Sequence, residues 1–372
     1  MGKRGRLWDV ASLFGTLGVI GFGGPAAHIS LMRREVVERR AWLTDAEMID
    51  LVGVTSLIPG PNSTELAMLV GLRRAGRPGL LVAGLAFILP AAAIVVVLAW
   101  AYVAYGASPA GEAVLYGIEP VVVAVIVSAV IAFARTALRS PLTIALAVVV
   151  ALLWLAGASE ILLLGASALV VAVARVRTRP PMIALLAPLT TGMAAVDLMA
   201  LGGVFLKAGA LLYGSGYVLV AFLRGDLVDR LGWLTDAQLL DAVAIGQVTP
   251  GPLFTTATFV GYVLAGVPGA VVATVAIFLP AFVIVALVGP WVARIRERPI
   301  TAALLDGVNA AAIGLMAAVA VQLSAAAIRD PMTATIGIVA GILLVIGKVP
   351  SVLLIVGGGV AGLAASAAGI GP

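Results

Sequence analysis

The chain has 372 residues, of which 62% are hydrophobic and 11% are charged, and its mean hydropathy is +1.17. Soluble domains carry about 25% charged residues, so this composition excludes an ordinary soluble enzyme or nucleic-acid-binding domain despite a net charge of +5. The absence of cysteine excludes disulfides, thiolate metal sites and cysteine nucleophiles. Uncharged apolar runs, such as 80–105, 142–159 and 270–293, are long enough to cross a bilayer. We therefore predict a polytopic, all-α membrane protein.

An internal duplication organises the sequence. Residues Trp42–Pro61 read WLTDAEMIDLVGVTSLIPGP, and residues Trp233–Pro252 read WLTDAQLLDAVAIGQVTPGP, at an offset of 191. After this stretch the offset becomes 190, and the match continues to Arg139-Ser140-Pro141 and Arg329-Asp330-Pro331. A repeat of this length predicts two copies of one structural unit.

Each unit divides into six apolar segments, of which the first two are interrupted. Glycines interrupt the first segment, and Pro-Gly-Pro divides the second into halves of about 14 residues, roughly 20 Å, which is shorter than a ~30 Å hydrocarbon core. We predict broken or re-entrant helices for these two segments and ordinary spans for the other four. The predicted boundaries are 1–180 for the first unit, 181–197 for a linking transmembrane segment and 198–372 for the second unit.

The loop charges indicate that the two units are inserted in opposite directions. The loop after the first broken helix is basic, whereas its counterpart, 263–267, has no basic residue; the next loop, 105–111, has none, whereas its counterpart is basic. The arginines concerned are Arg73, Arg74 and Arg77 in the first unit, and Arg294, Arg296 and Arg298 in the second. By the positive-inside rule this predicts an inverted-topology repeat, an architecture of secondary transporters. The alternative is chance variation of loop charge.

The two Pro-Gly-Pro breaks are the main candidates for a binding site. Proline lacks an amide hydrogen and ends the preceding helix, and the second proline suits the first position of a new helix. A helix start presents free N–H groups that attract anions. A single break would favour a packing kink, whereas two at equivalent positions favour a shared anion cradle. The predicted substrate-binding residues here are Pro59, Gly60, Pro61, Asn62 and Ser63, and Pro250, Gly251, Pro252, Thr255 and Thr256.

Glycine-rich turns interrupt the first segment of each unit. Glycine allows the backbone to approach a ligand closely, although membrane helices also use small residues for packing against each other. We include these turns in the predicted binding site. Their residues are Gly23, Gly24, Gly214, Ser215 and Gly216.

Three ionisable residues lie in or beside apolar segments. Lys207 lies between Leu206 and Ala208, and an ionisable group at membrane depth is a functional candidate, here for binding an anion. The alternative is a lysine that extends to the interface. His28, the single histidine, and Glu65, in the first turn after Pro61, are candidates for proton coupling. His28 also suits a capping role, and Glu65 suits a helix N-terminus.

Three stretches carry a family resemblance. They are FGGPAAHI (Phe22–Ile29), FLKAGALLYGSGY (Phe205–Tyr217) and VTPGPLFTTATFVGY (Val248–Tyr262), together with the two WLTDA segments. With the duplication, they resemble the chromate ion transporter family in its long-chain, two-half form, over nearly the whole chain. The resemblance implies a secondary transporter of the bacterial inner membrane that exports chromate, with sulfate as a structural analogue.

Other functions remain as alternatives. A passive oxyanion channel or a sulfate transporter would use the same fold. An intramembrane enzyme would need clustered catalytic groups, whereas this chain has one histidine, no cysteine and scattered carboxylates. We expect no enzymatic activity, cofactor, metal site or nucleic-acid partner. The expected partners are chromate or a sulfate-like oxyanion and the lipid bilayer, and a homodimer is kept as an open alternative.

Overall fold

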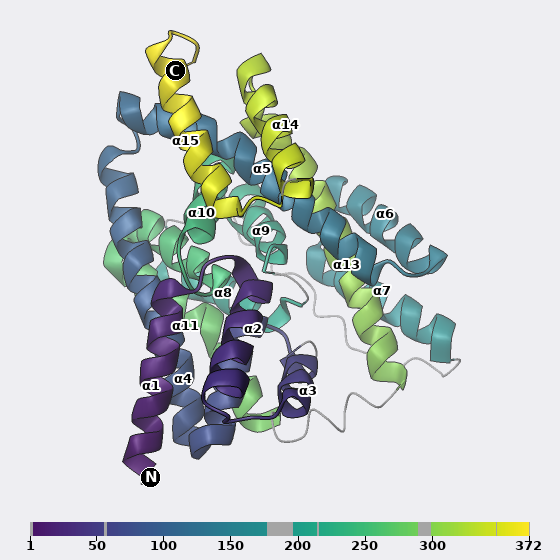
Figure 1. The fold of residues 1–372 in the computed structure, drawn as a ribbon. Coiled ribbons are helices and arrows are strands. Elements are labelled where there is room, and N and C mark those ends of the chain that lie inside the picture. Colours follow the sequence, from purple (N-terminus) through teal and green to yellow (C-terminus); the bar gives the residue numbers. More distant parts are fainter. Residues whose placement is uncertain are drawn as a thin grey trace.

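The computed structural model describes residues 3–55, 58–176, 196–213, 216–288, 299–346 and 348–371, and the described part contains helices and short connections (Figure 1). The elements of the first half are α1 (Lys3–Ile20), α2 (Gly24–Arg33), the π-helical η1 (Arg34–Arg39), α3 (Asp45–Thr55), α4 (Asn62–Tyr105), α5 (Pro109–Ala137), α6 (Pro141–Leu155) and α7 (Glu160–Val176). Those of the second half are α8 (Leu198–Leu211), α9 (Val218–Leu223), η2 (Arg224–Arg230), α10 (Asp236–Val248), η3 (Leu253–Thr255), α11 (Thr256–Val288), α13 (Pro299–Ala327), α14 (Pro331–Val345) and α15 (Ser351–Ala367).

Among the described residues, four helical stretches are long and apolar enough to cross a membrane. They are Asn62–Tyr105, Pro109–Ala137, Leu253–Leu287 and Ile300–Ala327. The all-α, polytopic prediction is confirmed. Most of the predicted linking segment, 181–197, lies outside the described residues, as do Arg294, Arg296 and Arg298.

Helix α4 is a hairpin of two arms. At Ala75 and Gly76 the backbone leaves the helical region, with φ +70° at Gly76, which glycine adopts without strain. Gly71 and Gly79 lie so close that a Cβ on Gly71 would clash with the Gly79 carbonyl oxygen. Such contact is impossible along one straight helix, so the chain folds back. The arm before the turn, from Asn62, is roughly 20 Å long, too short to cross a bilayer core.

Helix α11 repeats this hairpin. Its backbone breaks at Ala265 and Gly266, where φ is +61°, and Gly261 approaches Gly269 as Gly71 approaches Gly79. Both halves therefore contain a short arm that follows a Pro-Gly-Pro break and a long arm that returns. The short arm is the geometry that we predicted for a broken helix; its re-entrance into a bilayer stays a prediction.

The later helices are exchanged between the halves. In the first half, α5 packs against α14 and α15 of the second, while α13 of the second packs against α6 and α7 of the first (Figure 1). The largest buried cluster likewise contains side chains from both halves, including Ile126 with Phe205 and Leu315. The two halves form one interlocked body, and the sequence limits of the units stay a prediction.

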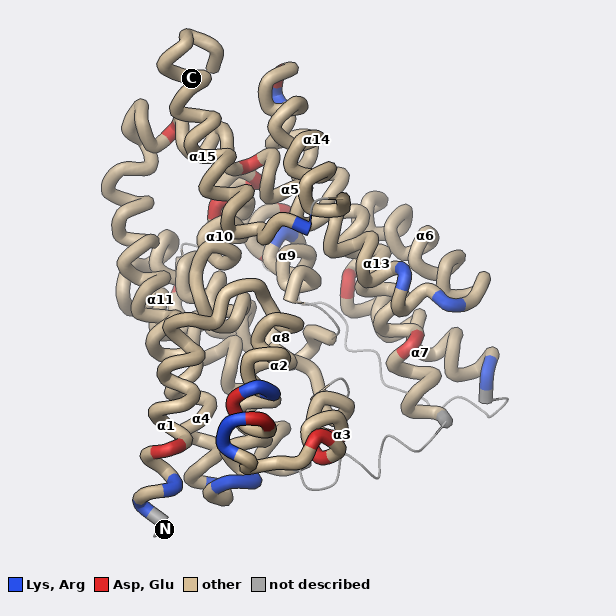
Figure 2. Tube along the Cα trace, in the orientation of Figure 1, with Lys and Arg blue, Asp and Glu red and all other residues tan. Residues whose placement is uncertain are grey.

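Equivalent elements lie at opposite ends of the long α4 arm. Trp42, which leads into α3, stacks against Arg74 at the hairpin turn, with 4.7 Å between the guanidinium carbon and the ring centroid. Asp241 of α10, the counterpart of α3, accepts a 2.8 Å hydrogen bond from Tyr102, near the other end of the arm. Figure 2 shows charged residues at the lower end, near α1, α2 and α3, and at separate positions higher in the molecule. An inverted repeat requires this arrangement, and the orientation across a membrane stays a prediction.

The hairpin crossing predicts a specific glycine requirement. Gly71→Ala places a methyl group against the backbone of Gly79, so we expect a loss of about 1–3 kcal/mol in stability from overpacking. In α7, Gly165→Ala is the control because no heavy atom lies within 4 Å of the added Cβ, and alanine is favoured over glycine in a helix by about 0.5–1 kcal/mol. The apparent unfolding temperature of the purified protein in detergent distinguishes them. Equal temperatures for the two variants would contradict the hairpin.

Candidate functional site

The first break is held by the opposite half of the molecule. Gly60 has φ +136°, and its N–H donates to the carbonyl oxygen of Leu212 at 2.8 Å. Leu212 ends α8. Pro61 is extended, with φ −80° and ψ 98°, and α4 begins at Asn62. The break therefore depends on a helix that is distant in sequence.

The second break makes the same contact in return. The Gly251 N–H donates to the carbonyl oxygen of Gly21, at the end of α1, at 2.7 Å, and Gly251 has φ +93°. Gly21 and Leu212 are 191 residues apart, as are Gly60 and Gly251, so the two hydrogen bonds are equivalent and exchanged. Reciprocal contacts of this kind are those of a two-fold arrangement.

The prolines differ slightly from the expected position. We predicted Pro61 and Pro252 as the first residues of the new helices, whereas each is the extended residue immediately before its helix. Proline's fixed φ is compatible with both positions, and at the position before the helix its carbonyl oxygen accepts the first helical hydrogen bonds. The prediction was wrong by one residue.

Polar groups at the two helix starts are used differently. In α4, the N–H groups of Thr64 and Glu65 donate to the Pro61 carbonyl oxygen, at 2.8 and 3.1 Å. The N–H groups of Asn62 and Ser63 come before these first helical bonds and have no acceptor within the helix.

At the second break the hydroxyl groups are already engaged. Thr255 donates its hydroxyl hydrogen to the Pro252 carbonyl oxygen at 2.9 Å, and Thr256 donates to that of Leu253 at 2.8 Å. To donate a hydrogen bond to an anion, these hydroxyls would have to give up their present bonds to the backbone carbonyl oxygens.

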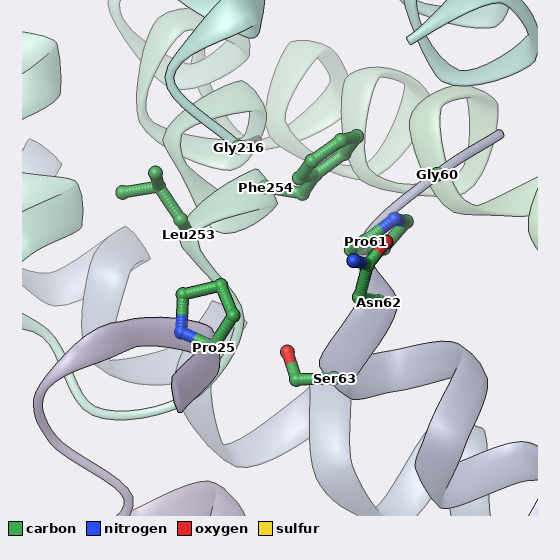
Figure 3. Close-up of a pocket in the computed structure, with 8 residues that line it drawn as sticks. All are labelled: Pro25, Gly60, Pro61, Asn62, Ser63, Gly216, Leu253 and Phe254. Carbon is green, nitrogen blue, oxygen red and sulfur yellow. The ribbon is translucent and has the colours of Figure 1, made fainter. Parts of the chain in front are cut away.

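One small cavity of about 10 Å³ lies between the first break, Leu253 and Phe254 directly after the second break, and Pro25 and Gly216 at the two glycine-rich turns (Figure 3). Such a cavity holds about one water molecule, so an oxyanion of five heavy atoms requires the surrounding turns to move apart. The lining residues are Pro25, Gly60, Pro61, Asn62, Ser63, Gly216, Leu253 and Phe254.

A second cavity of about 20 Å³ lies beside the second break and contains groups that the sequence analysis missed. Gln247 and Tyr217 line it together with Gly23, Gly24 and Gly251. The Gln247 amide interacts with the side chain of Tyr217, so the two polar groups lie together at the cavity. A glutamine at a helix end carries no distinctive sequence signal, since its counterpart in the other half is Ser56.

The remaining predicted residues do not line these two cavities. Gly214 and Ser215 lie outside the described residues. The others are Pro59, Pro250, Pro252, Thr255, Thr256 and Lys207. Their roles in binding stay predictions.

Glu65 is buried directly behind the first break. Its side chain is 0% exposed, and neither carboxyl oxygen has a hydrogen-bond partner in the described part of the chain. A Cβ on Gly60 would lie 2.5 Å from the Glu65 Oε1, so glycine is required there for steric reasons as well as for its φ angle. A carboxyl group thus occupies the space beside the anion-attracting helix start.

His28 closes the first glycine-rich turn. Its Nε2 lies 2.8 Å from the Gly21 carbonyl oxygen, its ring packs edge-on against Phe87, and its side chain is buried. The Gly21 carbonyl also accepts the hydrogen bond from Gly251. His28 therefore braces the contact between the halves, and its part in proton coupling stays a prediction.

Lys207 is engaged by two carboxylates. Its Nζ donates to Glu160 of α7 at 2.8 Å and also pairs with Asp226 of η2, whose side chain is 3% exposed. Arg230 completes the group by pairing with Asp226 at 2.9 Å. The lysine joins α7 of the first half to α8 and η2 of the second.

A repeated arginine contact stabilises the segment before each WLTDA stretch. Arg33 binds Asp45 and Glu38, and 191 residues later Arg224 binds Asp236 and Asp229. The set in the first half is about half exposed, whereas the Arg224 side chain is 9% exposed.

Lys207, which pairs with the buried Asp226, and the exposed Arg33 give a matched pair of variants. Lys207→Met leaves Asp226 with less compensating charge, and we expect it to cost about 3 kcal/mol of stability. Arg33→Met removes exposed ion pairs and should cost about 1 kcal/mol or less. Thermal unfolding in detergent measures both. A direct role of Lys207 in anion binding would instead appear as weaker chromate binding with unchanged stability.

Comparison with known proteins identifies the family. A family model described as chromate transporter matches residues 8–187 and 199–363. The chromate transport protein of Cupriavidus metallidurans is 35% identical over 373 residues, covering 96% of this chain and 93% of that protein. The probable chromate transport protein of Synechococcus elongatus is 35% identical over 352 residues, covering 90% and 88%. No solved structure matches the chain. With a family model that spans both halves and relatives matched over most of their length, this chain belongs to the chromate transporter family.

Proposed function

We propose that the protein is a secondary transporter that exports chromate, and sulfate-like oxyanions of the same shape, across the bacterial inner membrane. The observation that carries this proposal is the cavity between the first break and the residues directly after the second break, with Pro25 and Gly216 of the glycine-rich turns beside it (Figure 3). In membrane transporters, helix starts at such breaks hold anionic groups with backbone N–H donors. A homodimer remains an open alternative for the assembly.

The closed central cavity supports alternating access. The two halves touch there through the exchanged hydrogen bonds of Gly60 and Gly251, so a relative movement of the halves changes both contacts together. Substrate binds when the turns separate on one side and leaves when they separate on the other. A passive channel would instead conduct without a coupling ion.

Flux into proteoliposomes tests the site. Replacing Pro59-Gly60-Pro61, or Pro250-Gly251-Pro252, by three alanines should abolish chromate flux because the helix starts are rebuilt. Asn62→Ala keeps the backbone and removes the side-chain amide, which we expect to donate one hydrogen bond to the bound anion. Hydrogen bonds to charged groups contribute about 1.5–3 kcal/mol, so chromate flux should fall at least about tenfold. Pro109→Ala, at the start of α5, is the control. Unchanged flux in all the break variants would remove the site assignment, and ohmic flux would indicate a channel.

Glu65 suits proton coupling because it competes with the substrate. A carboxylate and an oxyanion would repel each other at one helix start, so the anion binds when Glu65 is protonated. Tyr213 is a titratable neighbour of this carboxyl. A dianion that moves with one proton carries one net negative charge, and an inside-negative potential favours its export by about 2.3 kcal/mol per 100 mV.

Glu65→Gln separates coupling from transport. The amide imitates the protonated carboxyl, so we expect exchange of chromate across the liposome membrane to persist while chromate-dependent proton movement disappears. Glu112→Gln, at the exposed start of α5, is the matched control. An internal pH dye and chromate counterflow measure the two activities. Proton movement that survives in Glu65→Gln would exclude this residue as the carrier.

A further inference from the structure

A wide cavity adjoins the first break. Its volume is about 720 Å³, and its walls come from the start of α4, the end of α5, and α13. Asn62 lines both this cavity and the small central one, so the wide cavity leads directly to the proposed binding site. The cavity described beside the second break holds about 20 Å³. The described structure is therefore open at one break and tightly packed at the other.

The walls of the wide cavity carry an uncompensated positive charge. Arg175 is neutralised by an ion pair with Asp306. Arg139 donates from Nε to the Thr136 carbonyl oxygen at 2.7 Å, and within the described part of the chain no carboxylate forms an ion pair with it. Two arginines and one aspartate give these lining residues a net charge of +1.

The duplication explains why this arginine is free. Its counterpart 190 residues later, Arg329, donates to the Glu119 Oε2 at 2.6 Å, and the Glu119 side chain is buried. The residue 190 positions after Glu119 is Asn309, which lines the wide cavity with Arg139. Glu119 of the first half and Arg329 of the second therefore form a neutral pair, whereas the equivalent position beside Arg139 holds an amide in place of the carboxylate.

The cavity walls hold both polar and apolar side chains. An unpaired guanidinium in such a cavity raises the local concentration of anions, and its planar set of donors matches an oxyanion. We infer that the wide cavity is an anion vestibule and that Arg139 selects small tetrahedral oxyanions there before they reach Asn62. This inference rests on the proposed transport function for its substrate. It assigns Arg139 a positioning and selecting role that is separate from the Pro-Gly-Pro cradle.

A single reporter thiol tests the vestibule independently of transport. Because the chain has no cysteine, Thr136→Cys places one thiol in the cavity wall. The measured quantity is the reaction rate of a negatively charged methanethiosulfonate divided by that of a positively charged one. We expect this ratio to exceed the value for access that does not depend on charge. In this background Arg139→Gln should lower the ratio of the two rates about tenfold. Asn309→Glu should do the same, because it places a carboxylate beside Arg139 at the position equivalent to Glu119 while keeping the arginine.

The matched control is the double variant Glu119→Gln with Arg329→Gln, which removes the equivalent neutral pair outside the wide cavity and should leave the ratio unchanged. An unchanged ratio in both Arg139→Gln and Asn309→Glu would overturn the vestibule. If Arg139→Gln fails to fold, Asn309→Glu alone decides, since it retains the arginine.

Transport supplies the second readout. In proteoliposomes, both vestibule variants should raise the KM for chromate about tenfold, with little change in the maximal rate, and should flatten its dependence on ionic strength. A wild-type protein that shows the anion preference but moves no chromate would refute the proposed function and leave the vestibule standing. Chromate transport with no effect of either variant would refute the vestibule alone.

Discussion

Two exchanged hydrogen bonds hold the centre of this protein. Gly60 donates to Leu212 and Gly251 donates to Gly21, so each broken helix is fixed by the first helix of the opposite half. Both glycines have positive φ angles, and both lie where a side chain would meet a neighbouring group. The central cavity, the buried Glu65 and the bracing His28 all depend on these contacts, because they lie against the same turns.

The two copies of the duplicated unit have nearly the same backbone structure, but their side chains differ at the breaks. The hairpin turns at Gly76 and Gly266 have almost the same φ angles, and the arginine contacts recur at an offset of 191. At the breaks, however, Asn62 and Ser63 stand opposite Leu253 and Phe254. The polar lining, the buried carboxyl and the wide cavity all gather at the first break, so the two halves share a scaffold and divide the proposed functions.

The sequence predicted those features that depend on local residue chemistry. Proline and glycine determine where helices end, so the breaks, the short arms and the all-α class could be predicted from the pattern at Pro59-Gly60-Pro61 and its copy. The exchange of helices, the two carboxylate partners of Lys207 and the place of Gln247 beside the second break could not be predicted, because each depends on residues distant in the chain. The binding roles of the predicted site residues stay predictions.

The exchange of helices has a consequence for biogenesis. In α5, Gly117 packs against α15, and Glu119 pairs with Arg329, which lies directly before α14; both partners come about 200 residues or more later in the chain. At about 5–20 residues per second, a ribosome needs roughly 10–40 s to supply them. During that interval the newly inserted first half must keep a glycine-lined seam and a carboxyl group in contact with lipid or with an insertion factor. Assembly of this protein is therefore completed late, when its final two helices close the seam.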